Sequence, residues 1–377
     1  MIILVLLFLS VLLLTYFNGA NDNFKGVATL WGSGTLEFRQ ALILATIFTL
    51  AGSVCSYFFA ETLIKNFSGK GLVPDSLIQS KEFVLSVALG AGITVLLATK
   101  FGFPISTTHG LVGALIGAGL VGAGSAVNFG VLGKTFFTPL ILSPIIAVVL
   151  SSIIYFIFKK VRQVAGVTAE DCICVGKKWI PVAIAQTHTG KFVSIQESSP
   201  IQVTAGNAEN CQKQYQGKFL GITVQPLVNF LHYISAGLVS FARGLNDTPK
   251  LVSLLLICNF FNLPTNIWIL AFVMAIGGWL NSKKVANTMS KKISSLNHGQ
   301  GFSANLVTSC LVIAASKFGL PVSTTHVSVG SIYGIGIVNK TANKKEISKI
   351  GLSWLMTLPI ASVISANVYF ILIHINL

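Results

Sequence analysis

Long runs of residues without Asp, Glu, Lys or Arg recur along the whole chain. Ten of them stand out, and they cover residues 1–21, 40–60, 83–99, 101–133, 135–158, 219–242, 251–282, 293–316, 318–339 and 350–377. A helix needs about 20 apolar residues to cross the hydrocarbon core of a bilayer. The pattern therefore predicts an all-α integral membrane protein with roughly eight to twelve membrane segments.

One stretch breaks this pattern. Residues 159–218 hold 8 Lys or Arg and 4 Asp or Glu. Short alternating pieces at 179–187 and 191–196 are typical of β-strands. We therefore predict a small polar insert, possibly β, at 159–218, between a first membrane repeat at 1–158 and a second at 219–377.

Composition excludes a soluble protein. Hydrophobic residues make up 53% of the chain and charged residues only 10%, whereas an average soluble domain carries about 25% charge. The net charge of +15 comes from 26 basic against 11 acidic residues. Most of the basic residues are Lys between apolar runs, where they anchor helices at lipid headgroups and mark cytoplasmic loops. No nucleic-acid partner is therefore expected.

The six cysteines do not form an evenly spaced set, so no disulfide framework is predicted. Cys172, Cys174 and Cys211 lie together in the polar insert. Three thiols without the usual CxxC spacing make an incomplete metal motif. Ordinary structural thiols are the favoured interpretation.

Two motifs occur once in each half of the chain. Residues 17–25 match 242–250 with a shift of 225, and the shared core is Gly-x-Asn-Asp-x-x-Lys. Residues 100–109 match 317–326 with a shift of 217, at eight identical positions of ten, and both end in Ser-Thr-Thr-His. Two motifs in the same order indicate an internal duplication. In membrane proteins this favours a transporter whose site lies between the repeats.

Asp22 and Asp247 are the first candidates for chemistry. An Asp at the centre of a membrane helix costs roughly 2.5–3.5 kcal/mol on the insertion scale. A helix-terminal Asp that reaches water is the alternative, since each copy ends an apolar run. The accompanying Asn21 and Asn246, with Gly nearby, disfavour a continuous helix. A helix broken there would expose carbonyls and a carboxylate that can hold a small cation.

The Ser-Thr-Thr segments are the second candidates. Pro in the first turn and Ser or Thr at the cap predict helix N-termini near Ser106 and Ser323. Free N–H groups and the positive end of the helix dipole bind anions. Capping alone is the alternative, but a break inside an apolar run needs internal partners, because lipid cannot satisfy freed backbone groups. The predicted anion ligands are Ser106, Thr107, Thr108, Ser323, Thr324 and Thr325.

Three further residues are possible accessories. His109 and His326 end the second motif, and they orient a hydroxyl, titrate or simply pack. Arg243, one of only three Arg, replaces Asn18 of the first copy, so the site is not fully symmetric, and Arg243 contacts either the anion or a lipid headgroup. The glycine spacing at 113/117 and 330/334 is small-xxx-small and predicts close helix packing.

These residues resemble the inorganic phosphate transporter family (PiT), the sodium- or proton-coupled phosphate permeases. The family signature is Gly-Ala-Asn-Asp in each half. It is intact at residues 19–22, and at 244–247 Leu245 replaces the Ala. The Pro-x-Ser-x-Thr-His segments are also present twice. The resemblance covers both membrane halves and leaves out only the insert.

The resemblance implies phosphate uptake driven by a cation gradient, inverted repeats and a homodimer in the cell membrane. It implies that the paired residues Asn21, Asp22, Asn246 and Asp247 bind Na⁺ as the coupling ion, that the two Asp also contact phosphate, and that the six Ser and Thr bind phosphate. The runs at 101–133 and 318–339 are expected to form re-entrant helical hairpins, with a full crossing by one copy as the alternative, and no further cofactor is implied.

The sequence thus predicts a secondary transporter that imports inorganic phosphate with Na⁺, and not an enzyme. Proton coupling is the near alternative, because a desolvated Asp can titrate. Sulfate is the near alternative for the anion. A membrane hydrolase using Ser106, His109 and Asp22 belongs to another class, but a hydrolase gains nothing from a second full set. A channel is disfavoured, because the candidate residues form a closed site rather than a pore.

Overall fold

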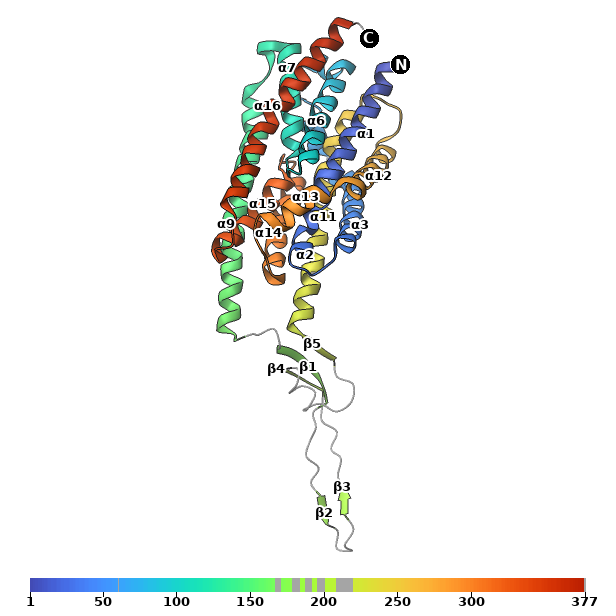
Figure 1. Ribbon diagram of the computed structural model, residues 1–377. Coiled ribbons are helices and arrows are strands. Elements are labelled where there is room, and N and C mark those ends of the chain that lie inside the picture. The colour runs from blue at the N-terminus through green and yellow to red at the C-terminus, as the bar shows by residue number, and fades with distance from the viewer. Residues whose placement is uncertain are drawn as a thin grey trace. The chain divides into compact units, whose positions relative to one another are not determined.

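The computed structural model describes residues 1–59, 61–166, 171–177, 184–186, 192–194, 201–207 and 220–375 (Figure 1). They divide into two compact units, one of residues 1–156 and 232–377 and the other of 157–231. The division that we predict, with boundaries at 159 and 218, stays a prediction.

The first half of the helical unit begins with α1 and ends with α9. Its elements are α1 Ile2–Asp22, η1 Lys25–Val27, α2 Ala28–Gly32, α3 Phe38–Phe59, α4 Glu61–Phe67, α5 Asp75–Ile78, α6 Lys81–Phe101, α7 Thr107–Ala123, η2 Gly124–Ala126, α8 Phe129–Val131, η3 Leu132–Phe137 and α9 Thr138–Val164.

The second half begins with α11 and ends with α16. Its elements are α11 Val224–Leu255, α12 Leu263–Asn281, α13 Lys283–Asn287, η4 Thr288–Lys292, α14 His298–Lys317, α15 Thr324–Asn339 and α16 Lys344–Ile375. The two halves interleave, since α1 packs on α12 and α7 packs on α16.

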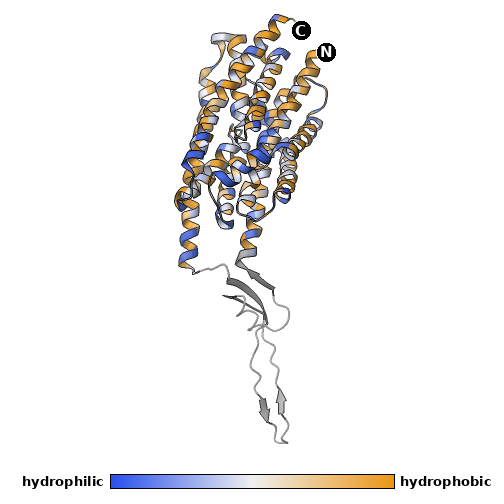
Figure 2. Ribbon diagram, in the orientation of Figure 1, coloured by the Kyte–Doolittle hydropathy of each residue, from blue (hydrophilic) through white to orange (hydrophobic). Residues whose placement is uncertain are grey.

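Among the described residues, seven helical segments are long and apolar enough to cross a membrane, and they cover 2–32, 38–59, 81–101, 107–126, 129–164, 263–281 and 344–375. Apolar residues run along most of the helical unit (Figure 2). Large hydrophobic side chains such as Ile141, Ile145 and Val149 on α9 are exposed, which suits a lipid-facing surface. The predicted all-α membrane fold is confirmed.

The helix break predicted at the first Asp is confirmed. The α-helix α1 ends at Asp22, and a short 3₁₀ turn, Lys25–Val27, precedes α2. The break predicted at the second Asp is wrong, because α11 continues through Asp247 to Leu255 and contains Pro249. A proline removes one backbone N–H, and here the helix continues past it. The charged residues between the runs 219–242 and 251–282 thus lie inside one helix.

The predicted helix starts at Ser106 and Ser323 are confirmed. Each serine is the N-cap of its helix, and its Oγ accepts from the N–H three residues later, at 3.1 Å from His109 and 3.2 Å from His326. The segments before these caps join α6 to α7 and α14 to α15. Gly102 and Gly319 have φ of 76° and 67°, a left-handed conformation that favours glycine at a helix end.

The glycine pairs of the repeats lie where helices meet closely, as the spacing predicts. A Cβ built on Gly117 would lie 2.0 Å from the carbonyl oxygen of Ser362 in α16, and one on Gly334 would lie 2.4 Å from that of Val148 in α9. The equivalent helices α7 and α15 therefore each pack on the last long helix of the other half.

Among the described residues, strands occur only in the unit that includes the predicted insert. Strand β1 Asp171–Lys177 pairs antiparallel with β4 Ile201–Asn207 and β5 Leu220–Thr223, while β2 Ile184–Gln186 pairs antiparallel with β3 Phe192–Ser194. The pair β2 and β3 lies within the two ranges predicted as strands. Cys172 and Cys174 are in β1, and Cys211 lies outside the described residues.

Candidate functional site

The interior of the helical unit holds a compact group of charged side chains. Among the described residues, the Asp, Glu, Lys and Arg side chains that are buried are Asp22, Lys25, Arg243, Asp247 and Lys250, each at most 3% exposed. Four of the five belong to the two copies of the Gly-x-Asn-Asp-x-x-Lys motif, and Arg243 directly precedes the second copy. If all are ionised, three basic groups face two carboxylates, so the group carries one surplus positive charge.

The Lys25 ammonium group is enclosed by oxygen atoms. Its Nζ donates to Oδ1 of Asp22, to Oδ1 of Asn21 at 2.9 Å and to the carbonyl of Ile105 at 2.8 Å. It also donates to Oγ1 of Thr325 at 2.6 Å. Asn21 and Asp22 come from α1 and Ile105 from the α6–α7 connection, whereas Thr325 is in the first turn of α15. We call these four oxygens the Lys25 cage.

Lys250 has an equivalent environment. Its Nζ donates to Oδ1 of Asp247 at 3.2 Å, to the carbonyl of Val322 at 3.1 Å and to Oγ1 of Thr108 at 2.8 Å. We call these three oxygens the Lys250 cage. Asn246 lies beside it and donates to the carbonyl of Val322 at 3.2 Å.

The two cages correspond at the carboxylate, the backbone carbonyl and the hydroxyl, and they differ at the asparagine: Oδ1 of Asn21 accepts from Lys25, whereas Oδ1 of Asn246 accepts from Ser316. Val322 and Thr325 are the counterparts of Ile105 and Thr108 at the shift of 217. Each lysine therefore contacts the connection of one half and the Thr of the other: Lys25 reaches Thr325, and Lys250 reaches Thr108. The two motifs, which the sequence shows as separate segments in each half, meet crosswise at one place.

The two carboxylates share a donor. Nδ2 of Asn18 lies 3.4 Å from Oδ2 of Asp22 and 3.3 Å from Oδ2 of Asp247. The same nitrogen lies 3.0 Å from Oγ1 of Thr107, which in turn lies 3.3 Å from Oδ2 of Asp22. Asn18 thus bridges the two halves of the site.

Arg243 connects the carboxylates to α1. Its Nη2 donates to Oδ1 of Asn18 at 2.8 Å, and its Nη1 donates to Oδ1 of Asn23 at 3.1 Å. Its Nε lies 3.6 Å from Oδ2 of Asp247 and has no hydrogen-bond partner among the described residues. A planar guanidinium with a free donor suits an oxyanion.

The Ser-Thr-Thr segments divide into two kinds of residue. Ser106 and Ser323 cap their helices, which is the structural role that we weighed against anion binding. Thr108 and Thr325 belong to the cages, Thr107 faces Asp22, and Thr324 is buried at 5% exposure. The structure therefore brings Thr107, Thr108 and Thr325 into contact with the charged group, whereas the cap serines accept from the backbone of their own helices.

The two candidate histidines lie together. The rings of His109 and His326, which are repeat counterparts, have centroids 4.5 Å apart. The His326 ring also stacks on Trp354 at 3.8 Å, and Trp354 donates to the carbonyl of Pro104 at 2.9 Å. Of the roles left open by the sequence, this contact favours packing for His326.

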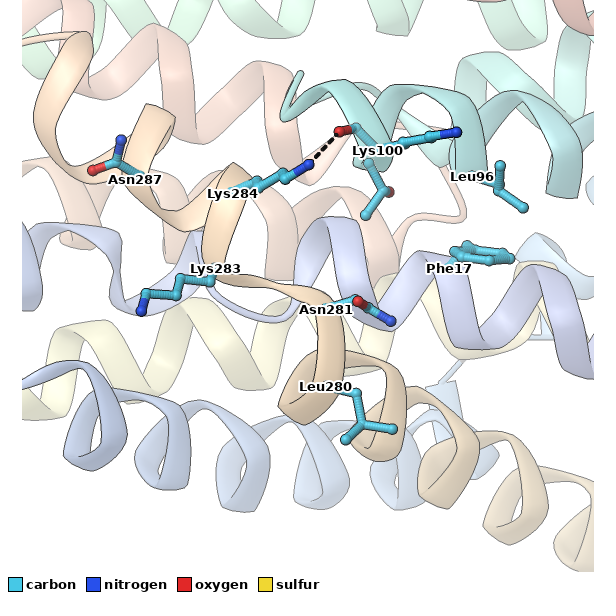
Figure 3. Close-up of a pocket in the computed structure, with 9 residues that line it drawn as sticks. Phe17, Leu96, Lys100, Leu280, Asn281, Lys283, Lys284 and Asn287 are labelled. Carbon is cyan, nitrogen blue, oxygen red and sulfur yellow. Dashed lines mark hydrogen bonds between the residues drawn. The ribbon is translucent and has the colours of Figure 1, made fainter.

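A hollow with a volume of about 720 Å³ opens next to the site (Figure 3). It is lined by Phe17, Leu96, Thr99, Lys100, Leu280, Asn281, Lys283, Lys284 and Asn287. Thr99 connects the hollow to the site, because its Oγ1 accepts from Asn21 at 3.0 Å. Lys284 donates to the carbonyl of Lys100 at 3.0 Å, as Figure 3 shows. The exposed lysines make the hollow attractive to anions.

Sequence reasoning missed three contributors. Lys25 and Lys250 stand in the shared motif but were assigned no role, and Asn18 was treated only as the counterpart of Arg243. The recurrence of Lys three residues after Asp in both halves is the signal that could have identified the lysines. For the described residues, no cluster of three or more His, Cys, Asp or Glu forms a metal centre.

Comparison with known proteins places the whole chain in one group. The model of the "Phosphate transporter family" matches residues 18–365. A "Putative phosphate permease" of Pyrococcus abyssi is 30% identical, with 94% of each chain covered. A "Probable low-affinity inorganic phosphate transporter" of Bacillus subtilis is 28% identical over 99% of this chain and 98% of its own.

A solved structure titled "The sodium-dependent phosphate transporter" has the same fold. It superposes with a TM-score of 0.75, covers all of both chains and is 21% identical. At that sequence identity the likeness establishes the fold alone. The chemistry of the site follows from its own residues.

Proposed function

Because this chain belongs to the phosphate transporter family, is a multi-pass membrane protein and is not an enzyme, we propose that it imports inorganic phosphate into the cell by secondary active transport across the plasma membrane. The phosphate binds between the two halves, and Na⁺ is the coupling ion. Family membership supports phosphate as the substrate, while the residues of the site support where phosphate and Na⁺ bind.

The buried group of three basic and two acidic side chains is the observation that carries this proposal. Burying an uncompensated charge is costly, so a group of three cations and two carboxylates favours an anion as its sixth member. Arg243, Lys25 and Lys250 supply the positive charges, and Nε of Arg243 has a donor to spare. An oxyanion at this place would complete the group.

Hydroxyl groups and helix ends complete the proposed anion site. Helices α7 and α15 begin at this place, and a helix N-terminus attracts anions through its free N–H groups and dipole. Thr107, Thr108, Thr324 and Thr325 add donors there without adding charge. Ser106 and Ser323 contribute mainly by fixing the two helix starts.

We propose Asn21, Asp22, Asn246 and Asp247 as the ligands of Na⁺. Amide and carboxylate oxygens are the ligands that hard cations prefer, and Asp22 follows directly on Asn21 at the end of α1. The name of the structural neighbour also supports Na⁺. In the structure, lysine ammonium groups contact the side-chain oxygens of Asn21, Asp22 and Asp247.

Inverted repeats with a pseudo-two-fold axis are part of the proposal. The crosswise contacts of Lys25 with Thr325 and of Lys250 with Thr108 support such an axis. Transporters of this design alternate access by rocking one repeat against the other around a fixed site. A homodimer, which the family resemblance implies, can be checked by light scattering of the purified protein in detergent.

Labelled phosphate uptake into proteoliposomes tests the function. The vesicles carry an imposed Na⁺ gradient, an imposed proton gradient or neither. Phosphate accumulation above equilibrium only with the Na⁺ gradient supports the full proposal. Accumulation only with the proton gradient keeps phosphate transport and replaces the coupling ion. Equilibration without accumulation in every condition overturns secondary active transport.

A further inference from the structure

The ammonium groups of Lys25 and Lys250 lie where the proposed Na⁺ ligands are. Asn21, Asp22 and Asp247 all point side-chain oxygens at an Nζ atom, at 2.9 Å for Asn21 and 3.2 Å for Asp247. The ligands that the sequence suggests for a free cation are therefore already bound to a cation that is part of the chain.

The four oxygens of the Lys25 cage resemble the ligands of a metal ion more than the hydrogen-bond partners of a lysine. An ammonium group has three donors, yet four oxygens surround Nζ of Lys25: a carboxylate, an amide, a backbone carbonyl and a hydroxyl. These oxygens come from three separate elements. A small cation with several oxygen ligands can bind all four at once, whereas a lysine has one N–H fewer than the oxygens around it, and the carbonyl of Ile105 also accepts from Oγ1 of Thr325 at 2.8 Å.

Two cations cannot share a cage of this size. Like charges a few ångströms apart repel strongly in a buried place, where screening by water is weak. Na⁺ can bind the cage oxygens only if the ammonium group moves out. A displaced ammonium group then has no carboxylate, and a bound phosphate is the negatively charged partner that the site would offer.

We propose that Lys25 and Lys250 are the resident cations of two equivalent oxygen cages and that Na⁺ enters a cage by displacing its ammonium group, which then binds phosphate. The inference rests on the proposed function for the identity of the anion. It explains why cation and anion would bind together: without Na⁺ the carboxylates neutralise the lysines, and with Na⁺ the lysines become free for the anion.

Na⁺ binding to purified full-length protein tests this inference without any phosphate. The readout is the rise in melting temperature as Na⁺ replaces N-methylglucamine at constant ionic strength. Lys25→Ala empties one cage, so its apparent Na⁺ affinity should be about tenfold or more higher than that of the wild type, in the range of ordinary site couplings. Lys349→Ala, which removes an exposed lysine bound to Glu346, should behave as the wild type. Equal Na⁺ affinity in Lys25→Ala and the wild type would overturn the inference.

A second pair of variants tests whether the oxygens of the cage bind Na⁺. Thr325 belongs to the Lys25 cage and Thr108 to the Lys250 cage. Lys25→Ala/Thr325→Val should therefore lose the gain in Na⁺ affinity, and Lys25→Ala/Thr108→Val should keep it. Equal gains in both double variants would contradict the assignment of the cage oxygens.

If Lys25→Ala does not fold, a measurement on the wild-type protein tests the same inference. Because Na⁺ frees the ammonium group, the phosphate Kd should fall by about tenfold or more between Na⁺-free and saturating buffer. A phosphate Kd that is independent of Na⁺ rejects the exchange, while phosphate binding itself remains intact. Failure of the proposed function would look different, because phosphate would then not bind or be transported at all.

Discussion

Arg243 donates from Nη2 to Oδ1 of Asn18 at 2.8 Å, although the two residues are 225 positions apart. They occupy the same place in the two copies of the first motif. An arginine in both copies would place two like charges in contact, and they would repel each other. An asparagine in both copies would leave the two lysines as the only positive charges beside the carboxylates. The single Arg therefore supplies the surplus positive charge of an otherwise paired site.

Replacing Arg243 by the residue of the other copy should weaken phosphate binding. Arg243→Asn removes the surplus charge and the unpaired Nε donor, and bonds to charged groups contribute about 1.5–3 kcal/mol. We expect the phosphate Kd to rise roughly tenfold to a hundredfold on that scale. Isothermal titration of purified protein measures it, and the exposed Arg39→Asn is the matched control. An unchanged Kd in Arg243→Asn would remove Arg243 from the anion site.

Neutralising either carboxylate should abolish gradient-driven uptake and lower stability. Breaking a buried ion pair from one side costs about 3–5 kcal/mol, because a buried charge loses its partner. Asp247→Asn should lower the melting temperature more than Asp22→Asn, since Asp247 pairs with both Arg243 and Lys250.

Glu346→Gln removes an exposed ion pair and is the control for both measurements. It should change the melting temperature little, because exposed pairs contribute about 0–1 kcal/mol. Full Na⁺-driven uptake by both Asp variants would show that neither carboxylate couples transport to the ion.

Removing single hydroxyls should separate two roles in the Ser-Thr-Thr segments. Thr324→Val keeps the side-chain shape and removes a donor, so phosphate affinity should fall about tenfold. Thr107→Val should do the same and also lower the melting temperature, because Thr107 bonds with Asn18 and Asp22. Wild-type phosphate affinity in both variants would show that these residues only shape the helix starts.

Arsenate should compete with phosphate, and sulfate should not. Phosphate and arsenate carry a proton at neutral pH, and an ionised carboxylate accepts from it. Asp22 or Asp247 beside a bare sulfate oxygen would face repulsion, and sites built around a substrate hydrogen bond reject the analogue that lacks it by roughly 10⁴-fold. Inhibition of labelled phosphate uptake by excess sulfate and arsenate measures this. Equal inhibition would place the carboxylates away from the anion.

The glycine of each signature should be intolerant of even one added carbon. A Cβ on Gly19 would lie 2.0 Å from the carbonyl oxygen of Met274, and one on Gly244 would lie 2.2 Å from that of Thr49. Gly19→Ala and Gly244→Ala should therefore lower the melting temperature clearly by forcing helices apart. Gly351→Ala, in open space on α16, should be neutral or stabilising by up to about 1 kcal/mol. Equal melting temperatures in all three variants would contradict this close packing.

Much of the fold could be predicted from the sequence. Uncharged runs mark the helices, since burying a charge in lipid is costly. The two helix starts at Ser106 and Ser323 are fixed by residues within three positions of the cap. The break after Asp22 was also predicted, whereas α11 continues through Asp247 despite the similar composition.

The sequence by itself determined the duplication, the apolar helices, the capped helix starts and the residue types of the site, because these depend on neighbours a few positions apart or on a comparison of the two halves. Only the tertiary structure decided that Lys25 meets Thr325 and that Arg243 meets Asn18. Such pairs, 300 and 225 residues apart, follow from how closely the helices of one half pack on those of the other. In the low-dielectric interior each buried charge must also find a partner, and helix packing determines which partner is within reach.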